Sequence, residues 1–220
     1  MTLFSNRVEA GRKLASALKG VGKDAIVLAV PRGGVVVGFE VAHALHLPLD
    51  VIITRKIGAP GNPELAIGAV AEDGSYQLDD SLVDMLRVPK DYIKAEVSNQ
   101  KAEIKRRLER YRGDAASPTL ADREVILVDD GVATGSTLKA ALRSLRKIGA
   151  KSVTVAVPVG PPDTIREFKR EADRVVCLQT PEEFYAIGEF YDDFEQTSDE
   201  EVTELLRRSR DALQSRRGNV

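Results

Sequence analysis

The chain has 220 residues, of which 43% are hydrophobic and 30% charged, and this composition excludes a disordered or fibrous protein. Its 34 acidic and 32 basic side chains leave a formal net charge of −2, which excludes an overall electrostatic field that would gather nucleic acid or an anionic membrane. The single cysteine excludes a disulfide framework and a thiolate metal cluster, and the apolar runs are far shorter than the roughly 20 residues that cross a bilayer. We therefore expect a cytoplasmic protein without a membrane partner.

Five short apolar segments, rich in β-branched residues, are the predicted core strands. They lie at residues 26–30, 51–54, 125–128, 153–157 and 174–178. Because nearly every position in them is apolar, each strand should be buried on both faces, as is typical of parallel sheets. Helical patterns follow three of these strands, at residues 35–45, 138–148 and 164–172. The alternation predicts an α/β fold with a Rossmann-like open, mainly parallel five-stranded sheet flanked by helices.

The stretch between the second and third core strands departs from this alternation. It contains a predicted short strand at residues 66–71, a turn at residues 73–74 and a long helix at residues 92–112. The long helix is basic, but pairs such as Glu103 with Arg107 are typical of a solvated helix face. We prefer that interpretation to a nucleic-acid-binding surface and expect no nucleic-acid partner.

A final helix is predicted near residues 198–213. It begins with acidic and ends with basic side chains, which complements the helix dipole without any binding partner. We expect residues 1–220 to form one domain, with a core at about residues 24–178 and a smaller lobe from about residues 1–20 and 179–220. We call this smaller lobe, built from the two ends of the chain, the hood.

The segment with the most chemical information is VILVDDGVATGST, residues 125–137. A buried strand ends at the acidic pair Asp129 and Asp130, and a Gly/Thr/Ser loop then leads into a helix. In an open α/β sheet, ligands bind at this carboxyl edge. Free backbone N–H groups at a helix start favour a phosphate, whereas the carboxylates suit a neighbouring diol or a divalent cation. A plain strand end with a helix cap is the alternative, but it does not require two acids, a glycine and three hydroxyls.

This segment resembles the phosphoribosyl pyrophosphate (PRPP) motif of the type I phosphoribosyltransferases. The resemblance implies that Asp129 and Asp130 bind the ribose 2- and 3-hydroxyls, at what we expect to be a surface edge of the sheet. Gly131 departs from the family, which usually has an aliphatic residue there. The loop residues that would wrap the 5-phosphate are Ala133, Thr134, Gly135, Ser136 and Thr137.

Two further segments fit the same family. The first predicted strand ends in a glycine turn, so by resemblance Arg32, Gly33 and Gly34 would face the diphosphate, often beside a cis peptide. The second predicted strand ends at Arg55 and Lys56, and the Gly/Pro-rich segment after them resembles the family's flexible catalytic loop. The resemblance implies that these two cations neutralise the departing diphosphate as the loop closes. A plain tight turn and ordinary surface cations are the alternatives.

The acceptor side of the site is less defined in the sequence. Purine-using members stack an aromatic side chain on the base after the last core strand, and by resemblance Phe184 or Tyr185 would do so. The alternative is that these aromatic side chains form the core of the hood. Ala133 stands where members that use 6-oxopurines carry an aspartate, so the resemblance disfavours hypoxanthine and guanine.

The resemblance implies transfer of 5-phosphoribose from PRPP to a nitrogen nucleophile, a nucleobase or an amine, with release of diphosphate. Arg55, Lys56, Asp129 and Asp130 would be the catalytic residues. Mg²⁺ would be held near the acidic pair through diphosphate, ribose and water, with no direct protein ligand. The alternative is a protein of the same fold that binds PRPP or a nucleotide as a regulator without turnover. A homodimer is compatible with either interpretation.

Overall fold

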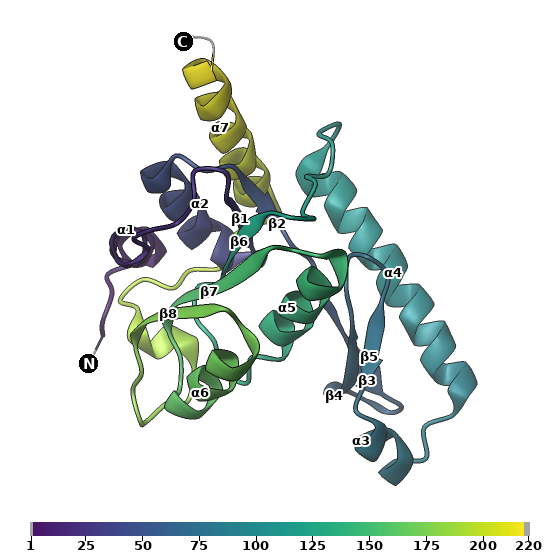
Figure 1. The fold of residues 1–220 in the computed structure, drawn as a ribbon. Helices are drawn as coiled ribbons and strands as arrows, with labels where there is room; N and C mark the ends of the chain where they lie inside the picture. The colour runs from purple at the N-terminus through teal and green to yellow at the C-terminus, as the bar shows by residue number, and fades with distance from the viewer. Residues whose placement is uncertain (1, 218–220) are drawn as a thin grey trace.

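The central sheet consists of five parallel strands in the order β2, β1, β6, β7, β8, which confirms the predicted fold class (Figure 1). The structure is a computed structural model that describes residues 2–217. The strands are β1 (Ile26–Ala29), β2 (Leu49–Val51), β6 (Glu124–Val128), β7 (Ser152–Val159) and β8 (Arg174–Gln179). In this order β1 and β6 are neighbours near the middle of the sheet, so the loops that follow them emerge side by side at its carboxyl edge.

Alternating side chains of the strands face two separate hydrophobic cores, which explains why the strand segments are continuously apolar. Val27 packs with helices α1, α2 and α7 on one face, whereas Leu28 packs with α5 and α6 on the other. The two helix layers lie on opposite sides of the sheet in Figure 1. The five helices are α1 (Arg7–Ala17), α2 (Gly33–Leu45), α5 (Ser136–Ile148), α6 (Pro162–Glu171) and α7 (Asp199–Arg217).

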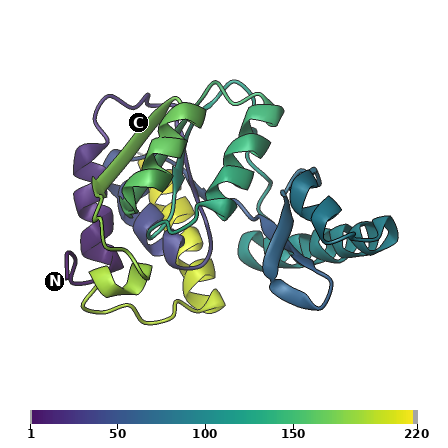
Figure 2. The same ribbon diagram turned by 90° about the horizontal axis from the view of Figure 1, so that it is seen from below.

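A small antiparallel sheet with two helices forms the segment between β2 and β6, to one side of the central sheet (Figure 2). Its elements are β3 (Arg55–Ala59), β4 (Asn62–Val70), β5 (Tyr76–Leu78), α3 (Asp80–Met85) and α4 (Lys90–Arg112). The strand expected at residues 66–71 is the second half of β4. The long helix packs the predicted apolar residues Ile93, Val97 and Ile104 into the core.

Two expectations for this region are wrong. The Gly/Pro-rich segment after Lys56 is an antiparallel hairpin, β3–β4, in place of an open loop. Gly58 and Pro63 stand where the hairpin register shifts, and a Cβ atom at Gly58 would come within 2.8 Å of the Pro63 backbone. The residues that indicated a loop therefore form an irregular part of the hairpin. The second core strand, expected at residues 51–54, lies at Leu49–Val51, and the apolar Ile52 and Ile53 are buried in the connection to β3.

Residues near the start of the chain meet the segment before α7 beside β7. Phe4 forms an isolated parallel bridge with Tyr191, next to a short 3-10 helix, η1 (Ile187–Phe190). Phe4, Phe190 and Tyr191 form a third buried cluster with Val159 of β7. Helix α7 then leaves this region and packs against α2 and α4. Within residues 2–217, no helix is long and apolar enough to cross a membrane.

Candidate functional site

The predicted donor-site segments converge at the carboxyl edge of the central sheet. The glycine turn follows β1, the connection to Arg55 follows β2 and the acidic pair follows β6, and these three strands are adjacent. Thr54 donates a hydrogen bond from Oγ1 to the carbonyl of Thr137 at 3.2 Å, which joins the second segment to the start of α5. The parallel order of the strands thus brings together segments that are about a hundred residues apart in the sequence.

The acidic pair is more enclosed than a surface edge would make it. The Asp130 residue is only 9% exposed, and Asp129 Oδ1 accepts a hydrogen bond from the Asp130 backbone N–H at 2.9 Å. Burial raises the pKa of Asp129 well above its ordinary value, and the neighbouring charge of Asp130 raises it further. The expectation of exposed carboxylates is therefore wrong, because the hood and the loop after β1 cover them.

Arg7 is the residue that compensates the charge of Asp130. Its Nε donates to Asp130 Oδ2 at 2.8 Å, and its Nη1 donates to the carbonyl of Glu195 at 2.7 Å. The Tyr191 hydroxyl donates to the Asp130 carbonyl at 2.5 Å. Sequence reasoning missed both side chains, because Arg7 is one of several charged residues near the start of the chain and Tyr191 one of several aromatic residues near its end.

The glycine turn after β1 packs directly on the acidic pair. A Cβ atom at Gly33 would overlap Asp130 Oδ2, and one at Gly34 would lie 2.8 Å from Asp129 Oδ1. The Pro31–Arg32 peptide is cis, as the family resemblance implies. Glycine is required at positions 33 and 34 because any side chain there would displace the carboxylates.

The loop from Ala133 to Thr137 leaves the start of α5 open to a ligand. Gly135 occupies the N-cap position with a φ of 75°, and no side chain caps the helix. Thr134, Ser136 and Thr137 are exposed, and the hydroxyls of Thr134 and Ser136 lie 3.2 Å apart. The Thr164 hydroxyl donates to the Ala133 carbonyl at 2.7 Å. Uncapped N–H groups, a positive helix end and hydroxyl donors together form a suitable site for a phosphate.

The predicted cations each have a partner on a different element. Arg55 Nε donates to Gln100 Oε1 of α4 at 2.9 Å, and Lys56 Nζ lies 2.8 Å from Glu64 Oε2 across the hairpin. Arg32 Nη1 lies 4.0 Å from Asp199 Oδ1 at the start of α7. A 4.0 Å ion pair at a side chain that is 36% exposed is weak, so Arg32 can exchange this partner for a ligand anion.

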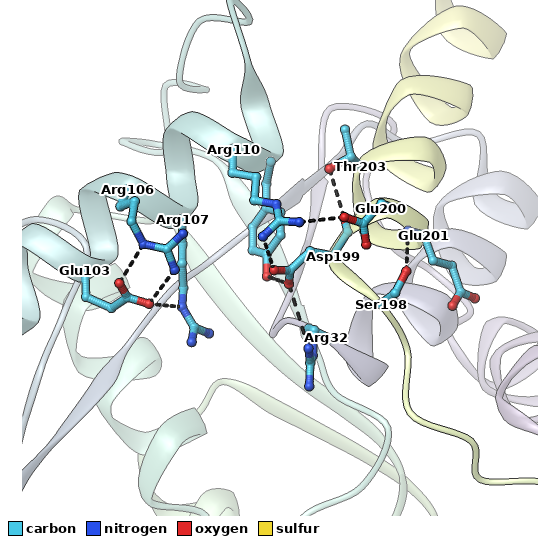
Figure 3. Close-up of polar contacts among 11 residues, drawn as sticks. Arg32, Glu103, Arg106, Arg107, Arg110, Ser198, Asp199, Glu200, Glu201 and Thr203 are labelled. Carbon is cyan, nitrogen blue, oxygen red and sulfur yellow. Dashed lines mark hydrogen bonds and ion pairs between the residues drawn. The ribbon is translucent and has the colours of Figure 1, made fainter.

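Asp199 is held in place by two residues of α4 (Figure 3). The Tyr111 hydroxyl donates to Asp199 Oδ1 at 2.6 Å, and Arg110 Nη1 lies 2.6 Å from Oδ2. The hydrogen bond from Tyr111 lowers the pKa of Asp199, while burial and this carboxylate raise the pKa of Tyr111 to about 12. In Figure 3, Arg110 and Arg32 approach Asp199 from two elements. The sequence offered only a dipole explanation for Asp199.

The two aromatic residues proposed for the acceptor differ in their surroundings. Phe184 lies against Phe190, with ring centroids 5.0 Å apart, and belongs to the apolar cluster of the hood. The Tyr185 residue is 82% exposed. The packing of Phe184 fits the alternative of a hood core, whereas the Tyr185 ring is accessible to a ligand.

Comparison with known proteins connects this site to one family. Residues 4–195 match the model of the phosphoribosyl transferase domain. A Mycobacterium tuberculosis (strain H37Rv) protein, provisionally named a phosphoribosyl transferase, is 47% identical over 210 residues. That match covers 95% of this chain and 47% of the relative, so the chain spans about half the length of the curated relatives it matches first.

Two further matches differ in extent. An adenine phosphoribosyltransferase of Chelativorans sp. (strain BNC1) is 45% identical over 62 residues, which is 28% of this chain and 33% of that protein. The crystal structure of TT1426 from Thermus thermophilus is 42% identical and superposes with a TM-score of 0.81 over 94% of this chain and 99% of that one. With its sheet order and its family match over residues 4–195, the chain belongs to the phosphoribosyl transferase domain family.

Proposed function

We propose that this chain transfers the 5-phosphoribose group of PRPP to a nitrogen nucleophile and releases diphosphate. The observation that carries the proposal is the junction of β6 and α5, where half-buried Asp129 and buried Asp130 are followed within five residues by an uncapped helix start. The helix start can bind a phosphate, and the two carboxylates beside it can accept hydrogen bonds from hydroxyls. These are the groups at the two ends of a ribose 5-phosphate. Membership of the family supports transfer from PRPP in general.

Each part of the site has a role in this reaction. The loop from Ala133 to Thr137 binds the 5-phosphate, and Asp129 and Asp130 accept hydrogen bonds from the ribose hydroxyls. The loop from Arg32 to Gly34 binds the diphosphate, with Arg55 and Lys56 as further cations. The bond from ribose C1 to diphosphate oxygen breaks with its electron pair on the oxygen, a C1–N bond forms, and the nitrogen loses one proton. The cations stabilise the charge that develops on the leaving group.

Mg²⁺ fits this proposal through the chemistry of the donor set. Hard divalent cations prefer oxygen ligands, and the acidic pair supplies carboxylate oxygens close to the proposed position of the ribose hydroxyls. Among residues 2–217 there is no group of three or more histidine, cysteine or acidic side chains that could enclose a metal ion. In this proposal the ion would be held by diphosphate, ribose and water beside Asp129 and Asp130, and when bound it would neutralise charge on the diphosphate.

A nucleobase is the acceptor that we favour. Ala133 lacks the carboxylate that the family resemblance associates with 6-oxopurines, and the short match to an adenine phosphoribosyltransferase favours adenine as the first candidate. Tyr185 is the better stacking candidate, since Phe184 already packs within the hood. We also propose that the hood and the core act as one domain, because Arg7 and Tyr191 of the hood bond to Asp130.

Two measurements test the proposal. Calorimetric titration with PRPP, with and without Mg²⁺, should show Mg²⁺-linked binding that the double variant Asp129→Asn/Asp130→Asn loses. Release of diphosphate should then be followed with adenine, uracil, hypoxanthine, orotate and simple amines, and one of them should support turnover. Failure of PRPP to bind would contradict the donor assignment. Binding without turnover on any acceptor would favour the regulatory alternative.

A further inference from the structure

Arg7 makes three contacts that join the hood to the proposed donor site. Its guanidinium donates from Nε to Asp130 Oδ2 at 2.8 Å and from Nη1 to the Glu195 carbonyl at 2.7 Å. The same group lies over the Phe194 ring, with Cζ 3.8 Å from the ring centroid. The side chains of Arg7 and Asp130 are only 11% and 13% exposed. Arg7 is thus a buried connection between α1, the segment before α7 and the end of β6.

The Asp130 carboxylate depends on this connection. Among the residues that the structure describes, Arg7 is the only cation within ion-pair distance of that carboxylate, whose near neighbours include a second acidic side chain, Asp129. The Tyr191 hydroxyl bonds to the Asp130 backbone carbonyl and leaves the carboxylate without a second charge-neutralising partner. A buried carboxylate next to another is stable as an anion only when a cation compensates it.

The geometry also fixes how the carboxylate is turned. Arg7 occupies Oδ2, and the backbone of Gly33 approaches the same oxygen so closely that a Cβ atom would overlap it. A carboxylate has about four acceptor positions on its two oxygens, so Oδ1 stays available for a hydroxyl while Oδ2 is held. Phe194 and the Glu195 carbonyl in turn hold the guanidinium in one orientation.

We propose that Arg7 is a positioning residue for the donor site, which holds the Asp130 carboxylate in the orientation that accepts a ribose hydroxyl. The inference rests on the proposed function of Asp130. It assigns the hood a part in donor binding as well as in acceptor binding. Because coupling between two events is reciprocal, PRPP binding should also stabilise the contact of the hood with the core.

The test is a double-mutant cycle on PRPP affinity, measured by calorimetry with Mg²⁺ present. Arg7→Met keeps an apolar stem against Phe194 and removes the charge, and it should weaken PRPP binding by about ten- to a hundredfold, the usual effect of losing one charged hydrogen bond. In the Asp130→Asn background the same substitution should change the affinity by less than about twofold, because an amide needs no compensating cation. Arg7→Lys should retain part of the affinity.

A matched control lies on the same helix. Arg12 is exposed, and its ion-pair partner is Glu40 at 2.9 Å in place of a residue of the acidic pair. Arg12→Met should therefore leave PRPP affinity unchanged. Thermal melting of each variant shows whether it is folded, and if Arg7→Met does not fold, the cycle is run with Arg7→Lys.

Two outcomes would overturn the inference. Unchanged affinity in Arg7→Met would show that Asp130 needs no positioning cation. An equal loss in the wild-type and Asp130→Asn backgrounds would show that Arg7 acts by another route, such as general support of the hood. If the unmodified protein binds no PRPP, the proposed function fails and this inference fails with it. If wild type and Arg7→Met both bind PRPP normally, only the role of Arg7 is contradicted and the proposed function stands.

Discussion

The two carboxylates of the acidic pair are adjacent in sequence but differ in their electrostatic surroundings. Asp130 has Arg7 as a cationic partner, whereas the carboxylate of Asp129 is bonded by the backbone N–H of Asp130. Burial and the neighbouring charge both favour the neutral form of Asp129 and raise its pKa. The ionised form of Asp129 therefore lowers the free energy of unfolding. Such a cost is common at ligand-binding sites, where binding is favoured at the expense of stability.

Asp129→Asn should make the protein more stable and weaken PRPP binding. Since the folded-state pKa of Asp129 is raised, its cost to stability is absent well below the ordinary aspartate pKa and grows as the pH rises through the folded value. The melting temperature of the variant should thus exceed that of wild type more at pH 8 than at pH 5, by about 2–4 °C for each kcal/mol. Melting curves at both pH values check this, with the exposed Asp122→Asn as control. An equal difference at both pH values would contradict the assignment.

At the scale of elements, the sequence predicts the central sheet well because its strands are apolar at most positions and are separated by helical patterns. The loops of the donor site follow from the same reasoning, since they begin where β1 and β6 end. The β3–β4 hairpin could not be predicted, because glycine and proline, as at Gly58 and Pro63, indicate a loop when only neighbouring residues in the sequence are considered. The strands form because β3 pairs with β4, and this pairing is not visible in either segment alone. Helix α1 was missed for a related reason: its buried face is short and includes alanines and a glycine.

The loop before α5 offers a test in which backbone strain and ligand binding can be separated. Gly135 has a φ of 75°, and a Cβ atom there would lie 3.0 Å from the Phe168 ring. Gly135→Ala should lower stability by about 1–2 kcal/mol through the left-handed backbone and should also reduce PRPP affinity. Gly20 has a φ of 77° with nothing near its Cβ position, so Gly20→Ala should show the strain alone. Melting and calorimetry on both variants are the measurements, and equal PRPP affinity in the two would count against the phosphate loop.

The hairpin provides a second test at this scale. The pair of Lys56 with Glu64 is exposed at both side chains, so it contributes little to stability. Lys56→Met should leave the melting temperature nearly unchanged and weaken diphosphate binding by about tenfold, the effect of one charged hydrogen bond. Lys94→Met, in an exposed pair with Asp91 on α4, is the matched control. A titration with diphosphate and Mg²⁺ in which both variants behave alike would remove Lys56 from the site.

At the scale of the whole molecule, one buried arginine joins the two sheets. Arg112, at the end of α4, donates from Nε to both oxygens of Asp50 at 3.1 and 3.0 Å and from Nη1 to Glu72 at 2.6 Å. It also donates to the carbonyl of Val51 at 3.1 Å. The side chain is only 7% exposed. Composition and periodicity could not identify this residue, because it continues a run of basic side chains that are mostly solvated.

Removal of this arginine should affect the fold more than any surface charge. Arg112→Met removes the ion-pair partner of buried Asp50 and half-buried Glu72 and should cost about 3–5 kcal/mol of unfolding free energy, which is roughly 6–20 °C in melting temperature. Burial raises the pKa of Asp50 and Glu72, so protonation should relieve part of the loss at pH 5 compared with pH 8. Arg106→Met, an exposed position on the same helix, should change the melting temperature by no more than about 1 °C. Melting curves of both variants at the two pH values decide the matter.

The bridge between Phe4 and Tyr191 has a consequence for the order of events during synthesis. The two residues meet across almost the whole described chain, so this contact closes one of the longest loops in the molecule, and long loops are costly to close early in folding. A nascent chain that ends before residue 190 already contains the acidic pair and the phosphate loop but not the residues that hold Arg7 from the other side. The proposed donor site can therefore be completed only after residues 190–195 have been synthesised, well after the acidic pair and the phosphate loop.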